Sequence, residues 1–233
     1  MNGPLYAVVP AAGIGERMGA GFPKQYLSLA GKTLAEHALN RLLSFAPIER
    51  VVVAVSQEDP WWPTLGVAGH SRIVTVTGGQ TRAESVRSGV EEVLALGGED
   101  AWVLVHDMAR PLIRLSDIQN LLDQTDPQGA ILALPVVDTI KQSGDDNHIS
   151  GTLDRDCIWR ALTPQLFPAA ALLEALQGSL AGITDEASAM ERAGWRPALV
   201  VGHSDNIKVT LPEDLALARF YLGRQLGDEE ELG

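Results

Sequence analysis

YAVVPAAGIGERMGAGFPKQ, from Tyr6 to Gln25, is the stretch of sequence around which the chain is organised. It opens with a short apolar run that contains β-branched residues, which predicts a buried strand. Small residues and glycines follow directly, so the chain can turn tightly and bring bare backbone N–H groups up to an anion. Arg17 and Lys24 place two cations in the same segment. This combination predicts a cradle for a triphosphate.

Two familiar phosphate-binding motifs are excluded by single positions. The dinucleotide fingerprint needs a third glycine after Gly13-x-Gly15, and Met18 stands at that position. The P-loop needs a glycine ahead of its Gly-Lys-Thr, and Tyr26 stands where that glycine would precede Gly31. The glycines alone fit an ordinary turn between a strand and a helix equally well. The two nearby cations favour the cradle.

The composition bounds the class of protein. The chain has 233 residues, of which 45% are hydrophobic, and this length fits one substantial domain with a real core. Its net charge of −12 offers no basic excess for a nucleic-acid partner. No apolar run approaches the roughly 20 residues of a membrane span, and no signal-peptide pattern is present. The single cysteine, Cys157, excludes an internal disulfide, so we expect a cytoplasmic protein without a membrane partner.

Apolar β-type runs alternate with helical patterns along the chain. The runs predict strands at 5–9, 50–56, 73–77, 101–106, 129–135 and 197–201. Capping boxes or a proline open the predicted helices at Thr33, Thr81, Ser116, Pro168 and Thr210. This alternation predicts a single α/β domain over residues 1–233, with a Rossmann-like, mostly parallel sheet and helices on both faces. Ligands of such sheets bind beyond the carboxyl ends of the strands.

Polar residues follow two of these strand ends. After the third strand, the bare backbone at Gly79 and the hydroxyl of Ser85 are suited to reading the edge of a base. After the fourth strand, Asp107 is flanked by His106 and Arg110. A carboxylate in this place suits a Mg²⁺ ligand beside a triphosphate. The spacing suits an ion pair between Asp107 and Arg110 equally well.

The segment after the fifth strand has a different pattern. Two alternating strands surround the polar turn 144–147 and predict a β-hairpin. A lone hairpin is marginal in water, so it is expected to pack on another surface. Thr163 and Thr184 each precede a helical pattern, and residue type alone predicts that they are helix N-caps. Asp185 and Glu186 read as first-turn charges that favour the helix dipole.

These segments, in this order, resemble the 2-C-methyl-D-erythritol 4-phosphate cytidylyltransferase family of the nucleotidyltransferase superfamily. The resemblance spans residues 6–221 and is carried by the motifs PAAGxGxRM, PKQ, GGxxRxxSV, HDxARP and DNxKVT. It implies transfer of CMP from CTP to 2-C-methyl-D-erythritol 4-phosphate, with release of pyrophosphate, in isoprenoid precursor biosynthesis. It also implies Mg²⁺ as the cofactor.

The resemblance implies roles for individual residues. The catalytic cations at the α-phosphate are Arg17 and Lys24. The nucleotide is bound by Pro10, Ala11, Ala12, Gly13, Gly79, Gln80, Ser85, Asp107 and Met108. The polyol phosphate is bound by Thr139, Arg155, Thr163, Thr184, Lys208 and Arg110. The metal is held by Asp107 and Asp205.

The resemblance also implies a homodimer. In the family the hairpin is an arm, here at about 136–160, that embraces a second subunit, and the match to Arg155 reaches the partner's active site. Met108 departs from the family pattern, which has a small residue there. Its thioether crowds the ribose if the side chain faces the pocket, and is harmless if only the backbone is used. Two alternative functions are a ribitol-phosphate cytidylyltransferase and a non-catalytic nucleotide-binding module.

Overall fold

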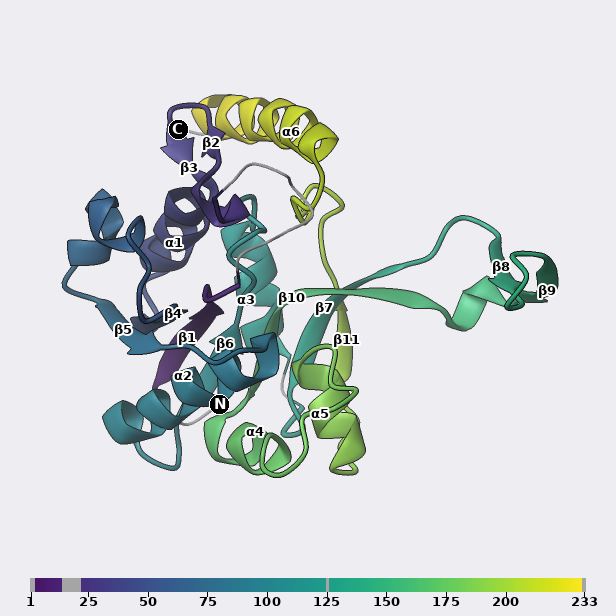
Figure 1. Cartoon of the computed structure of the whole chain (residues 1–233), viewed down its shortest axis with the longest axis horizontal. Helices are drawn as coiled ribbons and strands as arrows, with labels where there is room; N and C mark the ends of the chain where they lie inside the picture. Colours follow the sequence, from purple (N-terminus) through teal and green to yellow (C-terminus); the bar gives the residue numbers. More distant parts are fainter. Residues whose placement is uncertain (1–2, 14–21, 125, 232–233) are drawn as a thin grey trace.

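The computed structural model describes residues 3–13, 22–124 and 126–231. Its centre is a seven-stranded sheet with the order β11-β7-β10-β6-β1-β4-β5 and helices on both faces (Figure 1). The strands, in chain order, are β1 Leu5–Pro10, β4 Ile48–Val55, β5 Ile73–Thr77, β6 Trp102–Val105, β7 Ala130–Pro135, β10 Trp159–Pro168 and β11 Ala198–Val201. The predicted α/β class with a mostly parallel sheet is confirmed.

One central strand was absent from the predicted set. β10 lies between β6 and β7 and runs antiparallel to both, whereas the other neighbouring strands pair in parallel. The interpretation of Thr163 as a helix N-cap is therefore wrong, because this residue lies inside β10. The pairing register of β10 with β7 breaks between Ala161 and Gln165, the segment that contains Pro164. A proline inside a run argues against a central strand, which explains the missed prediction.

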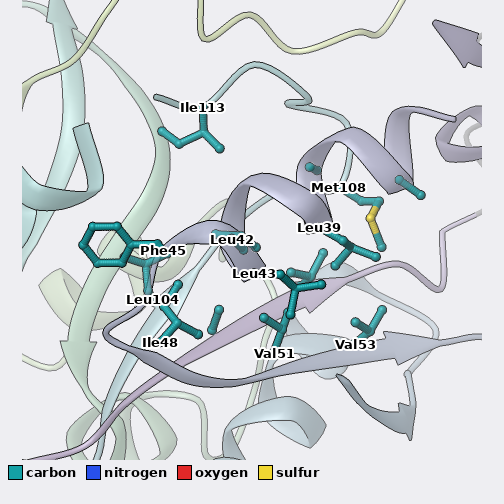
Figure 2. Packing of buried hydrophobic residues seen from close by; sticks show 14 of the residues in the cluster. Leu39, Leu42, Leu43, Phe45, Ile48, Val51, Val53, Leu104, Met108 and Ile113 are labelled. Atoms are coloured by element: carbon teal, nitrogen blue, oxygen red, sulfur yellow. The ribbon is translucent and has the colours of Figure 1, made fainter. Parts of the chain in front are cut away.

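Helices cover the two faces of the sheet with separate clusters of side chains. Successive residues of β1 point to opposite faces, so Ala7 packs with one cluster and Val8 with the other. The first cluster joins α1 and α3 to the sheet, and Figure 2 shows part of it, including Leu39 and Met108. The second cluster joins α2, α4 and α5 to the opposite face. The helices are α1 Leu34–Ser44, α2 Arg82–Gly97, α3 Leu115–Asp123, α4 Ala169–Ala175, α5 Glu186–Arg192 and α6 Pro212–Glu231.

The predicted helix starts hold at some positions and shift at others. Thr33 and Thr81 form the predicted capping boxes with Glu36 and Glu84. Ser116 does not cap α3, because that helix begins one residue earlier and Arg114 stands at its N-cap position. The side chain of Asp214, rather than Glu213, accepts the hydrogen bonds from Thr210 ahead of α6. Helix boundaries set by side-chain bonds are therefore correct to within a residue or two.

Smaller elements complete the molecule. A short antiparallel pair, β2 Ser28–Leu29 and β3 Lys32–Thr33, contributes Leu29 to a third apolar cluster that holds α6. The predicted hairpin is confirmed as β8 Ile140–Ser143 and β9 Ile149–Leu153, at the end of an arm that projects from the body (Figure 1). No helix in the described ranges is both long and apolar enough to cross a membrane. The remaining 3-10 turns are η2 Lys24–Tyr26, η3 Trp62–Thr64, η4 Gly66–Gly69 and η5 Arg155–Cys157.

Candidate active site

The backbone directly after β1, at residues 11–13, is held by a buried glutamine. The amide nitrogen of Gln25 donates to the carbonyl oxygens of Ala11 and Gly13, at 2.9 and 3.2 Å. Because these carbonyls are occupied by Gln25, the backbone of this loop is fixed where it leaves the strand. The neighbouring Lys24 donates from Nζ to the carbonyl of Val209 at 3.1 Å, which anchors it at the same edge of the sheet. Arg17, the other predicted catalytic cation, lies outside the described residues.

The loop between β5 and α2 lies against the first loop. Gly78 has no room for a side chain, because an added Cβ would come within 2.6 Å of the Cβ of Ala12 and 2.9 Å of Oγ of Ser85. The Ser85 hydroxyl is used inside this loop: it accepts from the Gly79 backbone at 3.1 Å and donates to the carbonyl of Thr81 at 3.0 Å. Ser85 therefore shapes the backbone around Gly79, in addition to bordering the cavity described below.

Asp107 follows β6 and is the centre of a charged cluster. Its Oδ1 accepts from Nε of Arg82 at 2.9 Å, and its Oδ2 accepts from Nζ of Lys208 at 2.7 Å. Burial would raise the pKa of Asp107, but the Arg82 and Lys208 charges outweigh burial and hold the pKa well below its usual value. Asp107 is therefore ionised at neutral pH. It does not form the ion pair with Arg110 that its spacing allowed, since the Arg110 side chain donates to the carbonyl of Asn206 at 2.6 Å.

A buried polar chain supports Asp107 from below. Its backbone N–H donates to the hydroxyl of Thr163 at 3.0 Å, and that hydroxyl lies 3.1 Å from Nδ1 of His106. Nε2 of His106 lies 2.9 Å from the carbonyl of Arg110. A carbonyl oxygen can only accept, so Nε2 of His106 carries the proton and donates to Arg110, while Nδ1 accepts from the Thr163 hydroxyl. Thr163 reaches this position because Gln165 pairs with Val105, so β10 continues past the end of β6.

Two cavities meet at this cluster. The first has a volume of about 320 Å³, within the range of small-ligand sites. The second has a volume of about 190 Å³. Arg82, Asp107 and Lys208 border both. The first cavity is otherwise lined by Pro10, Ala11, Ala12, Gly13, Lys24, Gln25, Gly79, Gln80, Thr81, Ser85, Met108 and Ala109. The second is otherwise lined by Arg110, Ala161, Leu162, Thr163, Gln165, Thr184 and Asp185.

Most of the predicted site residues border one of the two cavities, and the predicted nucleotide and polyol residues lie largely at different cavities. All of the predicted nucleotide-binding residues border the first cavity together with Lys24. Four of the predicted polyol residues border the second cavity, namely Arg110, Thr163, Thr184 and Lys208. The other two, Thr139 and Arg155, are exposed at the arm and border neither cavity. Met108 borders the first cavity but is only 4% exposed, because its side chain packs in the same apolar cluster as Leu39 (Figure 2).

Asp205 is placed differently from the prediction. Its carboxylate pairs with the guanidinium of Arg114, with a shortest separation of 2.5 Å, and also accepts from the amide of Gln225 at 3.0 Å. Asp205 borders neither cavity. This carboxylate is therefore part of a scaffold that ties the loop before Lys208 to α3 and α6. The structure does not bring it to Asp107 as a second metal ligand.

Two side chains of the charged cluster, Arg82 and Glu186, were not among the predicted site residues. Arg82 donates from both terminal nitrogens to Glu186, at 2.6 and 3.0 Å, while its Nε holds Asp107. Glu186 lies in the first turn of α5, as predicted, but it is 2% exposed, so its charge is buried and paired with Arg82. Asp185, not Thr184, caps α5, because its carboxylate accepts from the backbone of Ser188. A sequence signal existed: three and four residues after Glu186 the helix has apolar residues that are buried, which places a charge on the buried face.

The fold and the two cavities define an α/β nucleotidyltransferase: a backbone-lined pocket lies at the carboxyl edge of a parallel sheet and shares its cations with a second pocket. A family model described as 2-C-methyl-D-erythritol 4-phosphate cytidylyltransferase (IspD) matches residues 5–224. The chain belongs to this family and is a cytidylyltransferase.

Individual relatives agree over nearly the full length. The chain is 52% identical over 227 residues to the 2-C-methyl-D-erythritol 4-phosphate cytidylyltransferase of Haemophilus influenzae, covering 96% of this chain and 99% of the relative. A crystal structure of 4-diphosphocytidyl-2C-methyl-D-erythritol synthase has a TM-score of 0.82 at 38% identity, over 95% of this chain and all of that chain. The enzyme of Francisella tularensis has a TM-score of 0.79 at 34% identity, over 93% and 99% of the two chains.

Proposed function

We propose that the two cavities hold the two substrates of one cytidylyl transfer. The enzyme transfers CMP from CTP to 2-C-methyl-D-erythritol 4-phosphate and releases pyrophosphate, which gives 4-(cytidine 5'-diphospho)-2-C-methyl-D-erythritol for isoprenoid precursor biosynthesis. The observation that supports this arrangement is that Arg82, Asp107 and Lys208 border both cavities. Two phosphate groups bound on either side of these residues meet at one place.

The reaction is a direct in-line displacement. An oxygen of the polyol phosphate forms a bond to the α-phosphorus of CTP as the bond from that phosphorus to the bridging oxygen of pyrophosphate breaks. The attacking phosphate is already an anion, so no general base is required. Catalysis then consists of positioning and of stabilising charge on the α-phosphoryl oxygens. Lys24 is suited to that role from the first cavity and Lys208 from the boundary, and we assign Arg17 to the same role.

The nucleotide is assigned to the first cavity. Its walls at Ala12, Gly13 and Gly79 are backbone and small side chains, which allow close approach to phosphate and to the edge of a base. The polyol phosphate is assigned to the second cavity, where Arg110 supplies a cation and Thr163 a hydroxyl. The carboxylate of Asp107 lies between the two cavities and pairs with Arg82 and Lys208.

Asp107 also fits a Mg²⁺ site. Mg²⁺ prefers oxygen ligands, keeps several of its waters and is often bound by one or two carboxylates together with substrate phosphates. In the described ranges no group of three or more acidic, histidine or cysteine side chains is arranged to hold a metal, so a site with few protein ligands is the appropriate kind. The ionised Asp107 would hold the ion, which when bound supplies charge neutralisation for the triphosphate.

The arm is assigned to a second subunit. Thr139 and Arg155 belong to the predicted polyol site but lie on the arm, away from the cavities of their own chain. Val137 and Ile149 are 76% and 70% exposed, an apolar surface that favours contact with another chain. We therefore propose a homodimer in which each arm completes the second cavity of its partner.

One assay tests the reaction and its alternatives. Pyrophosphate release is measured with each of the four nucleoside triphosphates, in combination with 2-C-methyl-D-erythritol 4-phosphate or ribitol 5-phosphate. We expect rapid release only with CTP and the methylerythritol phosphate. Faster release with the ribitol phosphate would instead support the ribitol-phosphate cytidylyltransferase. No release in any combination, despite CTP binding, would support the non-catalytic module.

A further inference from the structure

Glu186 forms the buried end of the charged cluster. It is the first residue of α5 and is 2% exposed. Its two carboxylate oxygens each accept from a different terminal nitrogen of Arg82, at 2.6 and 3.0 Å. A bidentate pair of this kind fixes both the place and the plane of a guanidinium. Glu186 borders neither cavity, and its side-chain hydrogen bonds connect it to the site through Arg82.

Arg82 links this buried carboxylate to the boundary of the two cavities. Its Nε donates to Asp107 at 2.9 Å, and the opposite oxygen of Asp107 accepts from Lys208 at 2.7 Å. Burial would lower the pKa of Arg82, but Glu186 and Asp107 outweigh burial and raise it. The charges therefore alternate along one line, negative at Glu186, positive at Arg82, negative at Asp107 and positive at Lys208.

This alternation sets the charge that the substrates meet. Without Glu186, Asp107 would have to balance two cations alone, and the cluster would be net positive. With Glu186, the four charges sum to zero, and Arg82 is drawn toward α5 as well as toward Asp107. Because Arg82 is held by Glu186 on one side and Asp107 on the other, it cannot move toward one carboxylate without lengthening its hydrogen bonds to the other. Arg82 therefore holds the Asp107 carboxylate in one orientation. The hydrogen bonds of Arg82 to the two carboxylates use three of its five N–H groups.

Glu186 is itself held rigidly. The N-cap Asp185 accepts from Ser188 at 2.9 Å and from the amide of Gln165 at 2.8 Å. The same glutamine accepts from the backbone of Ala187 at 2.9 Å. The first turn of α5 is therefore fastened to β10 on both sides of Glu186, and its carboxylate cannot drift with the helix end.

We propose that Glu186 is a positioning residue for the transfer reaction. It fixes Arg82 at the boundary of the two cavities, and Arg82 in turn holds the Asp107 carboxylate in the orientation that the two phosphate groups require. This inference rests on the proposed function, since it assigns the cluster to the transfer step. It is separate from the roles of Lys24 and Lys208, which face the substrates directly.

The first test compares Glu186→Gln with Glu191→Gln, an exposed glutamate on the same helix. Residues that orient the ligands of a metal site through hydrogen bonds typically contribute roughly 10- to 100-fold to activity. We expect a loss in kcat of that size for E186Q. Its Kd for CTP, measured by calorimetry, should change by less than about threefold, because the backbone walls of the first cavity are intact. E191Q should match the wild type. Circular dichroism and thermal unfolding establish that each variant is folded at the assay temperature.

A double-mutant cycle separates positioning from a structural effect. If Glu186 acts through Arg82, the double variant R82Q/E186Q should be no slower than R82Q alone, within about twofold. Losses that multiply would overturn the proposal, as would an E186Q enzyme with unchanged kcat, or a loss that only follows its unfolded fraction. Should E186Q fail to fold, Arg82→Lys provides the test, because a lysine keeps the charge but cannot bridge both carboxylates, and its kcat should be lower than that of the wild type by roughly 10- to 100-fold. An R82K enzyme with the kcat of the wild type would then overturn the proposal.

The wild type is measured in the same pyrophosphate assay. An inactive wild type would overturn the proposed function and, with it, this assignment. An active wild type beside an unaffected E186Q, with R82Q slow, would overturn only the role of Glu186.

Discussion

Asp107 organises the chemistry at the scale of single residues. It is a buried carboxylate whose two oxygens each accept from a cation, and whose backbone is held by Thr163. Taking one charge out of water is unfavourable unless it is paired and hydrogen-bonded, and here the pairing is complete on both oxygens. The residues that satisfy Asp107 are also those that border the two cavities. The same contacts therefore stabilise the buried charge and prepare the site.

Lys24 provides a test of the proposed catalytic role. Lys24→Ala should fold normally and lose on the order of a hundredfold or more in kcat, because a cation at the developing charge is removed. CTP should bind with nearly unchanged affinity, since the remaining walls of the first cavity are untouched. Steady-state kinetics and calorimetry measure the two effects.

Lys32→Ala is the matched control, because this exposed lysine lies outside both cavities. It should behave as the wild type. A Lys24→Ala enzyme with full turnover would remove the proposed mechanism.

His106 predicts how stability depends on pH. Burial is the main reason that its pKa falls from 6.5 to about 4 in the folded protein. Between these values the unfolded chain binds the proton and the folded protein does not, so stability decreases as the pH falls from 6.5 toward 4. At about 1.4 kcal/mol per pKa unit, the full loss attributable to His106 is roughly 3.5 kcal/mol.

Urea unfolding at fixed protein concentration, at pH 7 and pH 4.5, measures most of this loss. His106→Asn should be less stable at pH 7 but should show a smaller decrease between the two values. Equal decreases in both proteins would show that other groups cause the acid sensitivity.

At the scale of elements, the site is made where the ends of strands meet. β1, β5 and β6 each end at the same edge of the sheet, and the loops that follow them form the first cavity. The chain brings two of these loops into direct contact at Gly78 and Ala12. This contact fixes the separation of the backbone walls of the first cavity. The shape of the cavity therefore depends on residue 78 being a glycine.

Gly78→Ala tests this dependence. The added methyl would meet Ala12 at 2.6 Å and Ser85 at 2.9 Å, so one loop must shift. We expect a loss of about 1–3 kcal/mol in the free energy of unfolding and a weaker affinity for CTP. Denaturant unfolding and calorimetry measure the two quantities.

Gly69→Ala is the control, since a methyl there would meet nothing within 4 Å. It should leave CTP affinity unchanged. Unaltered CTP binding in Gly78→Ala would show that the contact between the loops does not set the cavity.

The elements also show what the sequence could and could not predict. Continuous apolar runs predicted six strands of the central sheet. The inner strands β1, β4, β6 and β7 are largely buried, which leaves a strong signal, and the edge strands β5 and β11 have apolar runs although they are partly exposed. β10 was missed because Pro164 interrupts its pattern and because it runs against its neighbours. The arm was predicted because its turn residues and alternation are local features.

The parts of the site formed by the backbone of local motifs could be predicted from the sequence. Side-chain pairs between residues far apart in the sequence could not. Glycines and small residues identified the first cavity without the fold. Arg82 and Glu186 are 104 residues apart, so their pairing exists only in three dimensions. The pairing of Asp205 with Arg114 was not predictable for the same reason, because the two residues are 91 positions apart.

At the scale of the whole molecule, charge and shape are both uneven. The chain carries a net charge of −12, yet Lys24, Arg82, Arg110 and Lys208 gather around the two cavities. Cations concentrated in a cleft attract anionic substrates although the protein as a whole repels them. The shape is uneven because the arm extends from the body and carries Arg155 away from the cavities of its own chain (Figure 1).

The proposed dimer predicts that two inactive variants restore each other. Lys24→Ala disables the cavity of its own chain, and Arg155→Ala disables the arm that serves the partner. In a mixed dimer, the cavity of the Arg155→Ala chain keeps its Lys24 and receives an intact arm. One of the two sites is then complete. Random exchange makes half of the dimers mixed, so roughly a quarter of wild-type activity should return.

A second mixture controls for effects other than arm exchange. Lys24→Ala combined with Lys208→Ala should stay inactive, because both changes affect the body of their own chain and neither mixed site is complete. Subunit exchange is verified by mass spectrometry of differently tagged chains. The arm has no role in a partner's site if Arg155→Ala alone is fully active, or if verified mixed dimers recover nothing. Recovery in the first mixture alone requires that one site draws residues from two chains.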